Sequence, residues 1–549
     1  MRTSIATVSV GGTLAEKLTA IAAAGFDGVE IFENDLLASP MSPAEVRARA
    51  ADLGLSIDLY QPFRDFEAMP ADLLAANLRR ADHKFRLMRQ LGADLLLVCS
   101  NVSPAAIGSD ELAAEQLRSL ASLAAEYGIR IAYEALAWGR HVDDYLHAWR
   151  IVHLADHPNL GTCLDSFHIL SRGSDPIGIE AIPGEKIFFV QLADAPLLAM
   201  DVLQWSRHYR CFPGQGMLDV SGLVGHVLRA GYSGPLSLEV FNDVFRHADA
   251  GRTALDGMRS LIALGLPEPV GPTGFAFAEL AAADPARLGE LLAALGFVRT
   301  DAQCWEQGAA RIVLRTTDAS GEPELAAIGL GSPDPDAALT RARTLRATVL
   351  PGEHAIAAPD GTQIVFCPPT TVPRSGHITH IDHVALTQPW HHFDEAVLFY
   401  RSVLALCPQP SLEVPDPYGL LRSRAMNAGP VRMVLNITQV QGIPTQHIAL
   451  ACDDLVATAR ALPPDLLLEI PANYHDDLDA RYDLPFDHRA LGIMYDRDDH
   501  GEFLHLYTIT IGRVFFELVQ RVGGYQGYGA VNAPVRLAVQ HSRGSMTPQ

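Results

Sequence analysis

The first half of the sequence predicts a (β/α)8 barrel of the TIM-barrel type. Eight short β-rich runs alternate with helical patterns between residue 3 and about residue 264. This number of β/α units and the length of about 260 residues both match that fold. An open doubly wound sheet is the alternative, but SVGGTLAEK after the first run is a poor match to the phosphate-binding GxGxxG pattern.

The strand and helix candidates follow one another in a regular order. The strand candidates are SIATVSV, DGVEIFE, LSIDLY, ADLLLVC, IRIAYE, NLGTCLD, KIFFVQLAD and GPLSLEV. The first helix, TLAEKLTAIAAAGF, ends near Gly25, and the last is RTALDGMRSLIAL. In SPAEVRARAADLG, Ser42 is the expected N-cap, with Pro43 in the first turn and Glu45 completing a capping box.

A change of character after residue 264 indicates further domains. Residues 265–274 are rich in Pro and Gly, which predicts a linker. Residues 275–370 and 377–540 then repeat one plan, in which strands flank a helix, with TVPRSG (371–376) between them. We therefore expect a barrel over 1–264 and two related modules after the linker.

Composition narrows the class of function. The formal net charge of −22 disfavours nucleic acid as a partner. No apolar run reaches the ~20 residues needed to span a bilayer, and the N-terminus has no signal-peptide pattern. The seven cysteines form no CxxC pair, which favours reduced, buried thiols. We expect a cytoplasmic enzyme with a small-molecule substrate and no membrane partner; homo-oligomerisation stays open.

Polar side chains end the last four predicted strands of the barrel. They are Glu134, Asp165, Gln191 and Glu239. In this fold the carboxyl ends of the strands carry the chemistry, so these oxygen donors should converge. Crowded carboxylates repel one another, and a divalent cation relieves this; oxygen ligands favour Mg²⁺, Mn²⁺ or Co²⁺. The alternatives are salt-bridged carboxylates and, for Asp165, a helix cap.

The motifs YEAL, CLDSFH, VQLAD and LSLEVFND resemble the metal-dependent sugar-phosphate isomerase/epimerase barrels, which include xylose-isomerase-like enzymes. The two-domain layout is similar to that of bacterial 3-dehydroshikimate dehydratases of the fused type. The resemblance implies that the four strand-end residues bind the metal. It also implies dehydration of 3-dehydroshikimate to protocatechuate, a step of quinate and shikimate catabolism.

That reaction explains further residues. Removal of a proton next to the ketone builds an enolate, which a metal stabilises as a Lewis acid. His168, one turn beyond Asp165, is the predicted base. The substrate carboxylate needs a cationic clamp, for which we predict Arg64 and Arg210, with Ser206 as a hydrogen-bond donor. The long connection 196–218 is a candidate lid.

The C-terminal module resembles 4-hydroxyphenylpyruvate dioxygenase, through HITHIDHVALTQPW, QHIAL, LGIMYDRDDHGEFLHLYT and RVFFELVQR in that order. The resemblance implies an α+β vicinal oxygen chelate fold of paired βαβββ modules. It also implies a second divalent metal on His383, His447 and Glu517, the facial triad of non-haem Fe(II) enzymes. His391 and His392 are adjacent in a predicted loop, where their side chains should point apart at the surface.

Three residues depart from the dioxygenase pattern. His505 stands where that family has a Gln near the metal, Val531 replaces a glycine, and Ala533 replaces an aromatic residue. We therefore expect a metal-competent module without 4-hydroxyphenylpyruvate dioxygenase activity. Two alternatives remain for the whole protein: a sugar isomerase or epimerase in the barrel, and an Fe(II) dioxygenase acting through the C-terminal domain. The predicted arginine clamp favours the dehydratase over the first of these.

Overall fold

The structure is a computed structural model that describes residues 1–318, 321–352, 354–369, 376–417, 419–438 and 445–544. The chain divides into two compact units, Met1–Leu266 and Pro267–Gln549. Most of the predicted separator 371–376 lies outside the described residues.

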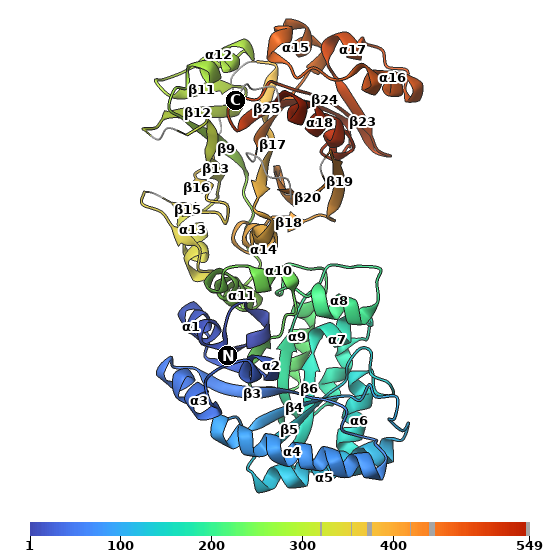
Figure 1. The fold of residues 1–549 in the computed structure, drawn as a ribbon. Coiled ribbons are helices and arrows are strands. Elements are labelled where there is room, and N and C mark those ends of the chain that lie inside the picture. Colours follow the sequence, from blue (N-terminus) through green and yellow to red (C-terminus); the bar gives the residue numbers. More distant parts are fainter. Residues whose placement is uncertain (319–320, 353, 370–375, 418, 439–444, 545–549) are drawn as a thin grey trace. The chain divides into compact units, whose positions relative to one another are not determined.

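The first unit is a closed barrel of eight parallel strands in sequential order, which confirms the predicted fold class. The strands are β1 (Thr3–Ala6), β2 (Gly28–Phe32), β3 (Ser56–Phe63), β4 (Leu95–Cys99), β5 (Arg130–Glu134), β6 (Leu160–Asp165), β7 (Ile187–Leu192) and β8 (Leu236–Leu238). Figure 1 shows them enclosed by helices.

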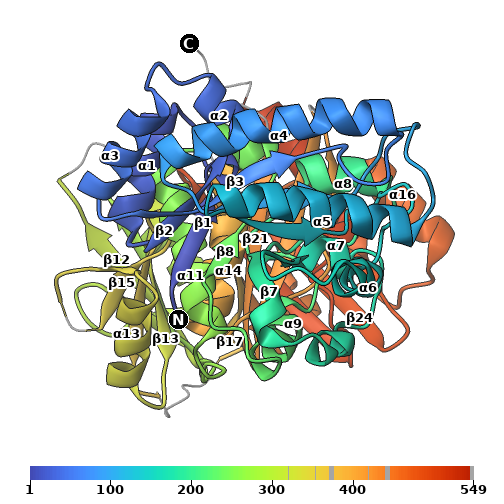
Figure 2. The ribbon, with the colours of Figure 1, turned by 90° about the horizontal axis from the view of Figure 1, so that it is seen from below.

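Nine of the eleven helices of this unit begin after a residue whose side chain caps them, and α2 and α4 are the exceptions. They are α1 (Leu14–Ala24), α2 (Glu33–Leu37), α3 (Pro43–Asp52), α4 (Ala71–Leu91), α5 (Asp110–Glu126), α6 (Tyr145–Ala155), α7 (Ser166–Leu170), α8 (Val202–His208), α9 (Val220–Arg229), α10 (Asp243–His247) and α11 (Ala250–Leu264). Ser42 and Glu45 form the expected capping box of α3. Helices α4 and α5 lie side by side on the outside of the barrel (Figures 1 and 2).

Two details differ from the sequence prediction. The first strand ends at Ala6 and continues as a short 3-10 helix, η1 (Thr7–Ser9). The connection 196–218 was expected as one long loop, but it contains helix α8. Local capping explains this helix, because the Asp201 carboxylate accepts the backbone N–H groups of Leu203 and Gln204.

The strands are apolar on both faces because the barrel has two cores. Leu95, Leu97 and Phe189 belong to the cluster inside the barrel. Leu96 and Val98, the alternate residues of β4, pack with the surrounding helices. All five residues of β4 are therefore buried, as expected for a parallel strand covered on both sides.

The second unit consists of repeated βαβββ modules, which confirms the vicinal oxygen chelate fold. Its first sheet contains β9 (Gly274–Ala282), β10 (Val298–Arg299), β11 (Cys304–Gln307), β12 (Ala310–Thr316), β13 (Glu324–Gly331), β14 (Thr348–Val349), β15 (Ala355–Ala357) and β16 (Gln363–Cys367). Helices α12 (Ala286–Ala294) and α13 (Pro335–Thr344) follow β9 and β13. Residues 265–273, ahead of β9, form no helix or strand.

The second sheet repeats this arrangement. It contains β17 (Ile378–Gln388), β18 (Cys407–Pro408), β19 (Leu412–Asp416), β20 (Gly419–Ala428), β21 (Val431–Thr438), β22 (Gln446–Cys452), β23 (Met494–Arg497), β24 (Gly501–Tyr507) and β25 (Val514–Gly523). Its helices are α14 (Phe393–Leu404), α15 (Leu455–Ala461), α16 (Ala472–Arg481), α17 (His488–Leu491) and α18 (Ala533–Gly544). Strands β17, β22, β25 and β24 are neighbours in this sheet.

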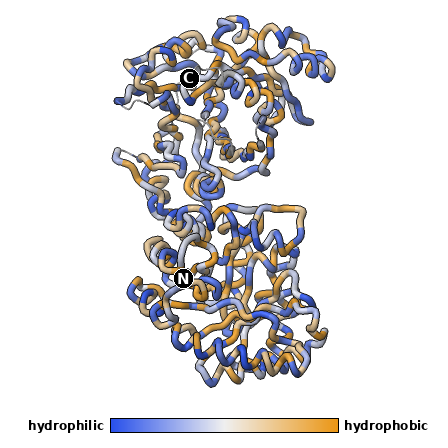
Figure 3. The backbone as a smooth tube through the Cα atoms, viewed as in Figure 1, coloured by the Kyte–Doolittle hydropathy of each residue, from blue (hydrophilic) through white to orange (hydrophobic). Residues whose placement is uncertain are grey.

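Apolar and polar residues alternate along both units (Figure 3). Among the described residues, no helix combines the length and hydropathy that crossing a membrane requires.

Candidate functional sites

Three carboxylates meet at the carboxyl end of the barrel. Glu134 ends β5, Asp165 ends β6, and Glu239 follows β8 directly. Each residue is at most 5% exposed. Parallel strands bring their carboxyl ends to one face, so residues far apart in the sequence share one site, as the sequence predicts.

The guanidinium of Arg210 lies among these carboxylates. Its Nη1 donates to Asp165 Oδ2 at 2.7 Å and to Glu239 Oε2 at 3.1 Å. Arg210 is 1% exposed, and its guanidinium also lies over the ring of Phe167. Ser206 Oγ, one turn earlier at the end of α8, accepts from Nε and Nη2 of Arg210. The structure therefore joins Arg210 of the predicted clamp, and Ser206 with it, to the acid cluster, with Ser206 accepting from Arg210. The contact of either residue with substrate stays a prediction.

Burial and mutual repulsion shape the acidity of the cluster. Burial, with the charges of Asp165 and Glu239, raises the pKa of Glu134 well above its usual range. Burial also raises the pKa of Glu239, although Arg210 opposes this. Burial would raise the pKa of Asp165 as well, but Arg210 and His168 bring it below the usual value. A cation beside Asp165 thus decides which carboxyl ionises.

The donor set fits a divalent cation. Ligand atoms of Glu134, Asp165 and His168 all lie within 4.8 Å of one another, so this group contains two of the four predicted ligands together with the predicted base. Glu134 Oε1 is buried and has no hydrogen-bond partner among the described residues. A cationic guanidinium already stands between two of the acids, which shows that the cluster requires positive charge.

Gln191 is held by a carboxylate that the sequence analysis missed. Its Nε2 donates to Glu30 Oε2 at 2.6 Å, while its Oε1 accepts the Cys163 thiol at 3.4 Å. Gln61 and Ser237 also donate to Glu30, which is fully buried. Burial, followed by the charge of Glu239, raises the pKa of Glu30 well above its usual value. An acid in the middle of the second predicted strand, DGVEIFE, was the available signal.

His168 lies in α7, one helical turn from Asp165, as predicted. Its Nδ1 accepts the backbone N–H of Ala137 at 3.0 Å, and its Nε2 lies 3.2 Å from Arg210 Nη2. The ring packs edge-on against Trp138. Burial and the nearby arginines lower the pKa of His168 to about 3, so the imidazole is neutral at physiological pH. Since a neutral imidazole accepts at one nitrogen only, these two contacts compete.

Two further residues lie on the loop after β3. Arg64 is half-buried, and the charges of Cys99, Glu134 and Glu239 raise its pKa, so its guanidinium interacts electrostatically with the acid cluster. Glu67 was not predicted. Its Oε1 accepts the backbone N–H of Asn101 at 2.6 Å and the hydroxyl of Tyr133 at 3.0 Å, and burial raises its pKa to about 7.

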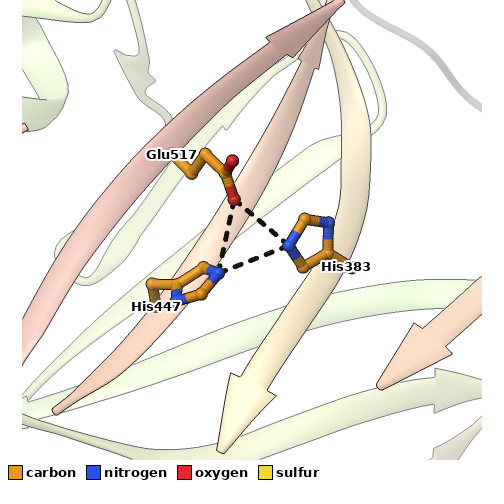
Figure 4. A group of neighbouring side chains, drawn as sticks. All are labelled: His383, His447 and Glu517. Carbon is orange, nitrogen blue, oxygen red and sulfur yellow. Dashed lines mark hydrogen bonds and ion pairs between the residues drawn. The ribbon is translucent and has the colours of Figure 1, made fainter. Parts of the chain in front are cut away.

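A second cluster lies in the C-terminal module. His383 on β17, His447 on β22 and Glu517 on β25 point toward one another (Figure 4). Glu517 Oε2 lies 3.2 Å from His383 Nε2 and 3.3 Å from His447 Nε2. The three ligand atoms lie within 4.8 Å of one another, as a 2-His-1-carboxylate metal site requires. The structure thus brings together the three residues that the sequence predicts.

Outer contacts orient two of these ligands. His383 Nδ1 donates to Asp382 Oδ2 at 2.8 Å, which leaves Nε2 for a metal. His505 Nδ1 lies 2.7 Å from Glu517 Oε1, and Asn532 Nδ2 lies 2.9 Å from His505 Nε2. Since the amide donates to Nε2, the proton of His505 sits on Nδ1 and points at Glu517. His505, which stands where the dioxygenases have a Gln, thus donates a hydrogen bond to the predicted carboxylate ligand Glu517.

The electrostatics of this cluster also suit a cation. Burial lowers the pKa of His447 to about 4, which keeps a neutral imidazole available as a ligand. Burial opposes ionisation of Glu517, but hydrogen bonds from the three histidines place its pKa well below the usual value. A neutral imidazole and an ionised carboxylate are the forms that bind metals.

The remaining predicted positions lie outside this cluster. His391 and His392 belong to a 3-10 helix, η4 (Trp390–His392), and their ring centroids are 4.2 Å apart, so the expectation that they point apart is wrong. The two residues lie in one tight helical turn, where the sequence predicted a loop, and this turn brings their rings together. Val531 is exposed and Ala533 begins α18.

Comparisons with known proteins agree with both halves of this description. The family of xylose isomerase-like TIM barrels matches residues 18–264. The 3-dehydroshikimate dehydratases of Pseudomonas putida and Pseudomonas aeruginosa are 45% and 46% identical to the chain, each alignment covering 98% of both proteins. A solved xylose isomerase-like TIM barrel/4-hydroxyphenylpyruvate dioxygenase fusion protein is 43% identical, with a TM-score of 0.90 and 99% of both chains covered.

Proposed function

The chain belongs to the family of 3-dehydroshikimate dehydratases and is a lyase, and we propose that its barrel converts 3-dehydroshikimate to protocatechuate with the help of a divalent cation. The observation that carries this proposal is the buried acid cluster of Glu134, Asp165 and Glu239, which holds a guanidinium at its centre. Loss of one water from the substrate leaves the aromatic product.

Glu134, Asp165, Gln191 and Glu239 would hold the cation, with oxygen donors that suit Mg²⁺, Mn²⁺ or Co²⁺. A cation bound there supplies Lewis acidity to the ketone oxygen and stabilises the enolate charge. Glu30 supports this arrangement by accepting from Gln191 Nε2, which turns the amide oxygen away from Glu30.

His168 takes the proton next to the ketone. Its low pKa keeps the ring neutral, and Nε2 is the nitrogen that faces Asp165 and Arg210. Nε2 can accept this proton only in the tautomer that carries its hydrogen on Nδ1, so the Ala137 N–H must release Nδ1 before the step. Acceptance at Nε2 then gives an imidazolium with N–H groups on both nitrogens. The same imidazolium then has a proton to give to the departing hydroxyl.

The substrate carboxylate is bound by the arginines. Arg64, on the loop after β3, interacts electrostatically with the acid cluster. Arg210 pairs with Asp165 and Glu239, would be free to bind the substrate carboxylate with a cation held by those acids, and is oriented by Ser206. One carboxylate held by two guanidinium groups places the ketone and hydroxyl end of the ring at His168.

The C-terminal module binds a second divalent metal through His383, His447 and Glu517 but does not oxidise 4-hydroxyphenylpyruvate. The triad is complete, while Val531 replaces a glycine of the dioxygenases and Ala533 replaces an aromatic residue that helps to enclose their substrate. Its role is to support the folding, assembly or regulation of the barrel.

The test of the dehydratase is a direct assay of the full chain. Metal-free protein is mixed with 3-dehydroshikimate and Mg²⁺, Mn²⁺ or Co²⁺, and the aromatic product is followed by ultraviolet absorbance. We expect turnover with at least one of these ions and none in EDTA. A sugar isomerase or epimerase would give no aromatic product from this substrate.

The test of the base is His168→Ala, with the partly buried His157→Ala as a histidine control outside the site. We expect His168→Ala to lower turnover at least 100-fold, the usual contribution of a general base, without loss of metal. Turnover within a few-fold of wild type, with metal still bound, contradicts the assignment.

A further inference from the structure

We propose that the C-terminal centre binds a small carboxylate, held at one end by the metal and at the other by the guanidinium of Arg536. This rests on the second metal of the proposed function and adds the class of ligand that the centre takes. The starting observation is an arginine from α18 that is buried against the triad.

Arg536 is 6% exposed, and its Nε is buried without a hydrogen-bond partner among the described residues. Its Nη1 donates to Gln540 at 2.7 Å, a neutral acceptor. In the part of the chain that the structure describes, no carboxylate forms an ion pair with it. A buried guanidinium with a free donor and no counter-ion is costly, which indicates a function.

The side chain lies next to the metal ligands. Its guanidinium carbon is 5.5 Å from the ring centre of Tyr507 and 5.3 Å from that of Phe515. The Phe515 ring in turn lies 5.0 Å from the ring of His447. Burial and the charge of Glu517 raise the pKa of Tyr507, and the charge of Arg536 opposes this. The same phenol group is therefore near both the guanidinium and the carboxylate ligand.

Local structure does not account for this arginine. It lies in the first turn of α18, where the helix dipole disfavours a cation. Its stacking on two aromatic rings stabilises the guanidinium but supplies no negative charge. The position is therefore better explained by an anion that arrives with the ligand.

Charge balance leads to the same class of ligand. Glu517 supplies one negative charge, which does not balance a divalent cation, and Arg536 adds a further positive charge in the same low-dielectric region. A ligand with oxygen donors for the cation and a carboxylate for the guanidinium balances both. The aromatic side chains of Tyr507 and Phe515 favour a flat, apolar body between these groups.

The experiment compares two probes that differ only in the carboxylate, 3,4-dihydroxybenzoate and catechol. Both are titrated calorimetrically into the Co²⁺-loaded full chain, and binding that survives in both His383→Ala and Arg536→Met is assigned to the barrel. The variants are Arg536→Met and Arg536→Lys, with Arg513→Met as a control, because Arg513 pairs with Glu324 away from the triad.

We expect Arg536→Met to weaken binding of 3,4-dihydroxybenzoate about 10- to 100-fold, the usual effect of losing a charge-assisted hydrogen bond, and to leave catechol binding unchanged. Arg536→Lys should lose less affinity for 3,4-dihydroxybenzoate than Arg536→Met, and Arg513→Met should bind it as tightly as wild type. Equal affinities for the two probes in wild type, or an unchanged affinity in folded Arg536→Met, overturn the inference. Melting temperatures of both Arg536 variants identify a misfolded one.

Cobalt stoichiometry separates this inference from the proposed second metal. The wild-type protein should bind one equivalent of Co²⁺ more than the His383→Ala variant. If it does not, the proposed metal fails, and the Arg536 dependence of carboxylate binding still decides the inference: a loss in Arg536→Met supports the anion site, and no change overturns it.

Discussion

Replacement of Arg210 by methionine tests whether this guanidinium substitutes for a cation in the metal-free barrel. Arg210→Met keeps a long apolar side chain against Phe167 but removes the charge between Asp165 and Glu239. We expect the metal-free variant to be strongly destabilised and a divalent cation to restore it.

The magnitude follows from the burial of the cluster. Both partners of the Arg210–Asp165 pair are essentially inaccessible, with side chains 1% and 0% exposed. Removal of one partner of a buried ion pair costs about 3–5 kcal/mol. A domain of this size loses about 2–4 °C per kcal/mol, so the melting temperature of the barrel should fall by roughly 6–20 °C in EDTA.

The assay is differential scanning calorimetry of the full chain with and without a divalent cation, in which the barrel transition is followed separately because the protein has two units. In wild type the cation must displace Arg210, whereas in the variant the carboxylates are free. The cation should therefore raise the melting temperature more in Arg210→Met than in wild type. Arg259→Met is the matched control, since it breaks another buried barrel ion pair, to Asp256, outside the acid cluster.

Two results would refute this reasoning. The first is an unchanged melting temperature of Arg210→Met in EDTA. The second is an equal gain from the cation in Arg210→Met and Arg259→Met, because a general destabilisation would then explain both.

The other predictions concern Glu67 and the C-terminal module. Burial raises the pKa of Glu67 from 4.5 to about 7, so the folded protein binds a proton more tightly than the unfolded chain, and stability falls as the pH rises from 4.5 to 7. Glu67→Gln should therefore raise the free energy of unfolding by about 3 kcal/mol at pH 8 and leave it unchanged at pH 4. Thermal melts of both proteins at pH 4 and pH 8 check this. An equal stabilisation at the two pH values would count against it. Fe²⁺-loaded protein given 4-hydroxyphenylpyruvate should consume no oxygen above background in an oxygen electrode, and robust uptake would contradict the proposal.

The order of the barrel strands and the positions of their ends could be predicted from the sequence, because parallel barrel strands are buried on both faces. Such strands appear as short apolar runs, and the first polar residue marks the end where chemistry takes place. Glu134 and Asp165 therefore stood out in the sequence. Glu30 is the central residue of β2, an equally apolar strand, so its position was the available signal, but the sequence could not show which partners it meets.

The triad of the C-terminal module was predicted from resemblance, and the sheet explains it. His383, His447 and Glu517 lie on three adjacent strands, β17, β22 and β25, which brings them to one face. The sequence marked His505 as a departure but could not show its consequence. Its contact with Glu517 depends on the pairing of β24 with β25, and its proton position depends on Asn532 from a later turn.

The sequence by itself determined the barrel and the carboxylates at its strand ends, because apolar periodicity and strand-end polarity are local properties of the chain. The second architecture and its triad were predicted from resemblance. The tertiary structure alone decided how those residues are paired. Arg210 reaches Asp165 across 45 positions and Gln191 reaches Glu30 across 161. A buried charge takes whichever partner the fold brings within hydrogen-bonding distance, and that distance is not encoded in any short segment of the sequence.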